Sequence, residues 1–164
     1  MVKGEAMKIT KKWLNETNAC YEGKAWFENQ NKDDMAEVCR QLLKENKFEW
    51  ANWTIAKVMN YKQRVSYAVY AAGLVLPIFE KKFPKDKRPR EDIEVAKKCI
   101  DNPTEENQIA AYDAYAFAAY DAAPFAAKAA NAAAYAAAYP SAFFAYDAAP
   151  FAARADATTK PKII

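Results

Sequence analysis

Alanine dominates the last third of the chain and constrains its fold more than any other feature. From Ile109 to Ala157, 26 of 49 residues are alanine, separated by tyrosines, phenylalanines and isolated charges. Alanine has the highest helix propensity, and its small side chain lets two helices approach toward the short end of their usual separation. Only three glycines occur in 164 residues, which leaves little material for β-hairpins. The sequence therefore predicts an all-α fold with closely packed helices in this tract.

A ten-residue phrase occurs twice in the alanine-rich tract. AYDAAPFAAK, which contains Asp121 and Pro124, returns as AYDAAPFAAR, which contains Asp147 and Pro150. If each aspartate is an N-cap, each proline falls inside the first turn of a helix, where its missing N–H costs nothing. The alternative is acid–base catalysis by the aspartates, but no partner side chain recurs at a fixed distance from them. We interpret the repeat as a helix start.

The chain is most simply one compact domain, an array of many helices. Its predicted parts are a module of short helices over 7–60, central helices with a basic connector over 61–101, the alanine-rich array over 104–157, and a tail over 158–164. The clearest early helix is DDMAEVCRQLLKEN, with Asp33 or Asp34 as its cap. Its predicted apolar stripe consists of Met35, Val38, Cys39 and Leu42.

The central helices carry recognisable start and stop signals. Asn60 and Gln63 fit a capping box that opens a long helix. Pro77 lies inside this helical pattern and predicts a kink or break near Gly73–Pro77. After a polar turn, Pro89 is well placed as the first residue of the next helix.

Composition excludes several classes of protein. There is no histidine, and Cys20, Cys39 and Cys99 are odd in number and far apart, so neither a disulfide framework nor a zinc site is expected. No cofactor is predicted. No secretory signal pattern follows Met1, which predicts the cytoplasm of a bacterial host cell. The uncharged stretch 129–146 approaches the length of a membrane span, but its Asn, Pro and Ser argue against a membrane protein.

The connector between the central helices, EKKFPKDKRPRED, is rich in basic residues. A phosphate group could dock at the start of the helix begun by Pro89, with the arginines around it. The alternative is a solvated connector, in which interleaved acids form local ion pairs. The basic residues are Lys81, Lys82, Lys85, Lys87, Arg88 and Arg90. A second candidate is a protein-binding surface of tyrosines that exceed what one face of the last third can bury.

The stretch AGLVLPIFEKKFPKDKRPREDIEVAKK, followed by the Ala/Tyr tract, resembles the alanine-rich immunity proteins of bacterial polymorphic-toxin systems. The resemblance covers roughly Val65 to Asp156. It implies that Arg88, Pro89, Arg90 and Glu94 are signature positions, and that the chain neutralises another macromolecule by binding it. The earlier stretch ITKKWLNETNACYEGKAWF is similar to a helical module of small phage and bacterial proteins, to which no reaction is attached.

We therefore predict a non-enzymatic binding protein whose partner is another protein, either a toxin or a defence component. No nucleophile–base or metal set can be assembled from the sequence. The alternative is a phage-encoded counter-defence protein that sequesters a nucleotide signal, or inhibits a nucleic-acid-targeting defence system, through Lys85–Arg90. The net charge of +3 is too small to decide for nucleic acid. The predicted anion- or partner-binding residues are Lys82, Lys85, Lys87, Arg88, Arg90 and Glu94.

Overall fold

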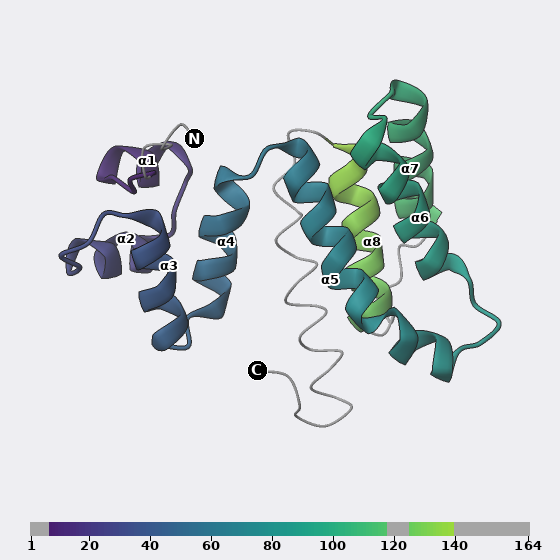
Figure 1. Cartoon of the computed structure of the whole chain (residues 1–164), viewed down its shortest axis with the longest axis horizontal. Coiled ribbons are helices and arrows are strands. Elements are labelled where there is room, and N and C mark those ends of the chain that lie inside the picture. Colours follow the sequence, from purple (N-terminus) through teal and green to yellow (C-terminus); the bar gives the residue numbers. More distant parts are fainter. Residues whose placement is uncertain (1–6, 118–124, 140–164) are drawn as a thin grey trace, which may run out of the picture. The chain divides into compact units, whose positions relative to one another are not determined.

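The computed structural model describes residues 7–117 and 125–139 (Figure 1). Within these ranges the regular elements are α-helices, with one isolated antiparallel bridge between Lys8 and Asp34. The all-α fold predicted from composition is confirmed. The chain divides into two compact units, Met1–Val58 and Met59–Ile164, and each is described by itself. The single-domain organisation stays a prediction.

The first unit has an aliphatic core with tryptophans packed against it. Asp34 caps α3 by accepting a hydrogen bond from the backbone N–H of Glu37 at 2.9 Å, as one of the two predicted caps. Val38, Cys39 and Leu42 of the predicted stripe are buried, whereas Met35 is half-buried. The tryptophans form two edge-to-face pairs, Trp13 with Trp53 and Trp26 with Trp50. Trp13, Trp26 and Trp50 pack against the core that contains Val38 and Leu42. The helices are α1 (Lys11–Glu16), α2 (Tyr21–Glu28), α3 (Met35–Lys44) and α4 (Phe48–Val58).

The second unit begins with the long helix α5 (Tyr61–Lys82). Its predicted capping box is confirmed, because Asn60 and Gln63 exchange side-chain-to-backbone hydrogen bonds of 2.9 Å. Pro77 lies within α5 without ending it, so the structure contains no break there. The last turns of α5 run at an angle to its first turns (Figure 1), which is the predicted kink. Proline removes the hydrogen bond to the carbonyl of Gly73, four residues earlier, which allows the helix to bend at this point.

Alanine forms the core of the second unit. The helix α8 (Phe125–Ala138) contacts α5, α6 (Arg88–Asp101) and α7 (Glu105–Phe117). It lies between α5 and the α6–α7 pair in Figure 1. Small side chains let three neighbours pack around one helix, as the composition predicted. The alanines of α8 with no exposed surface are Ala129, Ala130, Ala133, Ala134 and Ala137.

One hydrogen bond fixes the end of α8 to the start of α5. The Tyr61 hydroxyl donates to the carbonyl of Ala137 at 2.6 Å. Burial raises the pKa of Tyr61 to about 12, so the hydroxyl keeps its proton at neutral pH. The helix starts predicted at the two repeats, and the predicted tail 158–164, lie outside the described residues. The residues of the two predicted helix starts are Asp121, Pro124, Asp147 and Pro150.

Candidate functional site

The basic connector joins the end of α5 to the start of α6. Helix α6 begins at Arg88, so Pro89 is its second residue rather than its first. Proline is tolerated at either place, because the N–H groups of the first turn have no partner within the helix. All six predicted binding residues have exposed side chains on this connector and the first turns of α6. They are Lys82, Lys85, Lys87, Arg88, Arg90 and Glu94.

Arg88 forms a two-point ion pair with Asp86. Its Nε and Nη2 atoms donate to the two carboxylate oxygens at 2.8 and 2.5 Å, and its backbone N–H donates to Oδ1 at 3.2 Å. The hydrogen bond from Arg88 holds the pKa of Asp86 below its usual value. The carboxylate of Asp86 therefore occupies the position at the start of α6 where the sequence suggested an external anion.

Arg90 forms the second two-point ion pair, with Glu80 in α5. Both distances, from Nε and from Nη2 to the carboxylate oxygens, are 2.7 Å. The hydrogen bond from Arg90 lowers the pKa of Glu80. This pair links the last turns of α5 to the first turn of α6, and so fixes the geometry of the connector.

The remaining residues of the predicted set make fewer contacts. The Lys82 ammonium lies 5.5 Å from the centre of the Phe83 ring, and Glu94 accepts a hydrogen bond from Lys97 at 2.8 Å. Lys85 and Lys87 project from the exposed turn. The structure thus brings the six predicted residues onto one exposed segment, on which the two guanidinium groups form ion pairs with carboxylates of the same chain.

Asp92 is a notable residue of this region that sequence reasoning missed. Its side chain is 3% exposed, and its Oδ2 atom has no hydrogen-bond partner. Burial, with a smaller contribution from the charge of Glu91, raises the pKa of Asp92 to about 7. A signal was present, because Asp92 falls on the buried stripe of α6 between Pro89 and Ala96 at helical spacing.

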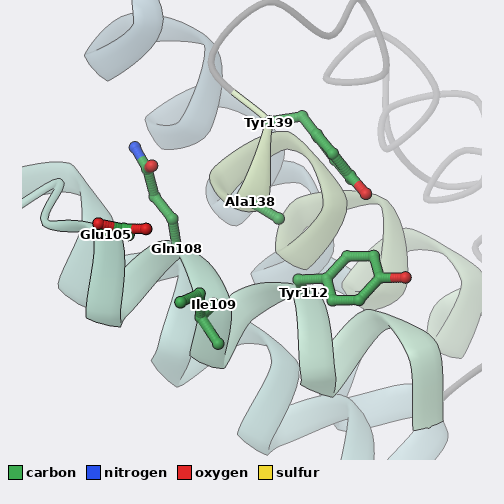
Figure 2. A pocket seen from close by; sticks show the side chains of 6 residues that line it. All are labelled: Glu105, Gln108, Ile109, Tyr112, Ala138 and Tyr139. Atoms are coloured by element: carbon green, nitrogen blue, oxygen red, sulfur yellow. The ribbon is translucent and has the colours of Figure 1, made fainter.

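A pocket of about 250 Å³ lies between α7 and the end of α8 (Figure 2). The rings of Tyr112 and Tyr139 meet edge-to-face, with centroids 5.8 Å apart. Exposed tyrosines in the last third were predicted, but the polar members of the lining were not. Their signal was the i, i+3, i+4, i+7 spacing of the four α7 residues, which places them on one face. The lining residues are Glu105, Gln108, Ile109, Tyr112, Ala138 and Tyr139.

A family model described as Imm-5 like putative immunity protein matches residues 55–158. The match covers well over half of the 164 residues. The chain belongs to this Imm-5 like family. The resemblance predicted from the connector and the alanine tract is confirmed, and the match extends further in both directions than Val65–Asp156.

The Imm-5 like match includes every described helix of the second unit, and therefore both the connector and the tyrosine pocket. No curated protein and no solved structure matches the chain significantly. In the described ranges, no three His, Cys, Asp or Glu side chains gather as a metal would require. None of the described helices has the length and apolarity of a membrane span. All three cysteines are free thiols.

Proposed function

We propose that this Imm-5 like protein neutralises a toxin by binding to it, without catalysing a reaction, in the cytoplasm of a bacterial cell. The observation that carries the proposal is the family match over the whole described part of the second unit. The free Cys20 thiol, which is exposed, is consistent with a reducing compartment.

The connector is the proposed contact region. Its two-point ion pairs fix the turn before any partner arrives, which lowers the entropic cost of binding. In this proposal Arg88 and Arg90 position the turn. The outward-facing Lys82, Lys85 and Lys87, together with Glu94, meet complementary charges on the toxin.

The same ion pairs argue against the alternative of nucleotide sequestration. A phosphate at the start of α6 would have to displace Asp86 from Arg88, and a second one Glu80 from Arg90. A thermal-shift panel of nucleotides tests this directly. We expect no stabilisation; a shift that disappears in Arg88→Ala would favour sequestration over toxin binding.

The test of toxin neutralisation is co-expression with each toxin-domain protein encoded beside the gene. We expect the chain to restore growth and to co-elute with one of these toxins. Exchange of Lys82, Lys85 and Lys87 for glutamate should weaken the complex by about tenfold or more, because each contact becomes repulsive. The charge-matched control exchanges three exposed lysines of the first unit that lie outside the family match: Lys11, Lys12 and Lys44.

Two results would count against this proposal. If no neighbouring toxin is neutralised or bound, the function is wrong. If the toxin is bound but the connector variant and its control behave alike, the function stands and the connector is not the contact.

A further inference from the structure

The pocket between α7 and the end of α8 combines exposed rings with a carboxylate. Ile109, Tyr112 and Tyr139 are 53%, 46% and 38% exposed, although the opposite face of α7 is buried through Ala111. Tyr139 also stacks on Tyr135, with ring centroids 4.7 Å apart. Tyr70 and Leu74 of the same unit are also exposed, but Ile109, Tyr112 and Tyr139 line one pocket together. A contiguous exposed apolar patch marks a place where another molecule binds.

The charge of α7 defines the chemistry of that molecule. The helix reads EENQIAAYDAYAF, with three acidic residues and no basic one. Glu105, Glu106 and Asp113 all have exposed side chains, and Glu105 lines the pocket itself. A partner that meets this face must therefore bring positive charge.

We propose that the tyrosine pocket, made by the six lining residues shown in Figure 2, binds an arginine or lysine side chain from an exposed basic segment of the toxin. The ammonium or guanidinium group lies against an exposed ring of the Tyr112–Tyr139 pair, which attracts cations, and the carboxylate of Glu105 at the other end of the pocket adds negative potential. Ile109 and Ala138 give the aliphatic stem of that side chain an apolar wall.

The size of the tyrosine pocket favours one side chain over a small-molecule ligand. Its volume of about 250 Å³ is below the range of roughly 300–1,000 Å³ typical of small-molecule sites. Tyrosine and arginine are enriched at the centre of protein–protein contacts, where an anchoring side chain fills a pocket on its partner. That the partner is a toxin rests on the proposed function, whereas the preference for a cationic side chain does not.

The first test uses the full chain with ¹³C-labelled tyrosine rings and two peptides. One hexapeptide carries three arginines, and the other carries citrulline, which is uncharged, in their place. The arginine peptide should shift the ring signals of Tyr112 and Tyr139 but not that of Tyr70, an exposed tyrosine of α5. Equal shifts with the citrulline peptide, or none at the two pocket tyrosines, would overturn the proposal.

The second test uses matched variants and the toxin complex. Tyr112→Ala and Glu105→Gln should each weaken binding by about tenfold. Tyr70→Ala and Glu106→Gln, which change exposed residues outside the pocket, should leave the affinity unchanged, and circular dichroism checks that all four variants fold. If the protein binds a toxin and pocket variants bind it as tightly as the controls do, the pocket inference is wrong and the proposed function survives.

A protein that binds no toxin would refute the proposed function, and the peptide titration would still decide whether the pocket prefers cations. Two other occupants are tested on the peptide-free protein by nuclear Overhauser contacts to the pocket rings. Concentration-independent contacts from residues 145–164, beyond the immediate neighbours of Tyr139, would assign the pocket to the chain itself. Contacts that grow with concentration would assign it to a second copy. Either result would overturn the proposal.

Discussion

The carboxylate of Asp92 is buried in α6 with one oxygen that accepts no hydrogen bond. Transfer of an ionised group out of water is costly, and the nearby carboxylates of Glu91 and Asp86 add repulsion that Arg88 only partly offsets. The folded protein therefore binds the proton of Asp92 more tightly than the unfolded chain does. This residue makes stability depend on pH.

The sign of this dependence follows from the raised pKa. Between the ordinary value of 3.8 and the folded value of about 7, the folded state holds more protons than the unfolded state. The contribution of Asp92 to stability therefore falls as pH rises through this window, with a slope of at most about 1.4 kcal/mol per pH unit. We expect the Asp92→Asn variant to lack this pH-dependent contribution to the free energy of unfolding. Urea unfolding of the wild type and the variant at pH 5 and at pH 8 measures the difference.

The pH dependence of wild-type stability must be compared with that of Asp92→Asn. Asp86 and Glu80 have lowered pKa values, so their contributions to stability change with pH in the opposite direction. Their stabilisation is present above their unfolded pKa values and is lost as the pH falls through the folded ones. The difference between wild type and Asp92→Asn isolates the buried group. Equal pH slopes in the two proteins would show that Asp92 is ionised in the fold without penalty.

At the scale of one helix, the packing of α8 is limited by the size of its side chains more than by their polarity. Ala133 has no exposed surface and lies on α8, which packs against three other helices. Ala133→Leu forces extra methylene groups into this core and should lower the free energy of unfolding by about 1–3 kcal/mol. Ala110→Leu, on the exposed side of α7, is the matched control and should change stability little. Equal effects in denaturant titrations would contradict the close packing of α8.

Gly73 offers a second test at the scale of one helix. A β-carbon at this position would meet nothing within 4 Å, so space does not require glycine there. Gly73→Ala should raise the free energy of unfolding by about 0.5–1 kcal/mol, through helix propensity and a less flexible unfolded chain. A loss of stability in thermal unfolding would mean that the bend at Pro77 depends on the glycine four residues before it.

The helix starts and the all-α class could be predicted from the sequence, because they depend on the local preferences of a few adjacent residues. Asn60 with Gln63, the cap at Asp34 and the bend at Pro77 each follow from a few adjacent residues. The pair Glu80–Arg90 could not be predicted in this way, because it depends on how α6 packs against α5. Helical spacing puts Asp92 on one stripe of α6 with Pro89 and Ala96, but only the packing of α6 against its neighbours buries that stripe. The tyrosine pocket has the same origin, since its two walls come from separate helices.

At the scale of the whole molecule, the two units differ in the residue types that form and surround their cores. The first unit contains all four tryptophans of the chain, and the second is built from alanine. Tryptophan fluorescence therefore reports on the first unit, whereas most of the helical circular dichroism signal comes from the second. This difference lets the cooperativity between the units be measured.

We expect a core substitution in the first unit to separate these two signals. Leu42→Ala should cost about 2–5 kcal/mol, because Leu42 is fully buried there. Its unfolding curve followed by tryptophan fluorescence should shift to lower urea, while the curve followed by circular dichroism keeps a later transition. Curves that shift together would show that the chain unfolds as one cooperative domain, as its length predicts.

The place of α8 in the chain affects how the second unit is made. This helix contacts all three of its partners, yet it is the last of the described helices to leave the ribosome. Domains generally fold as units during synthesis, N-terminal parts first. Until residue 138 has emerged, the apolar faces of α5 and α6 lack the helix that covers them. Completion of this unit's core must therefore wait for translation of α8, and a nascent chain stalled before this helix should be an easy substrate for proteases.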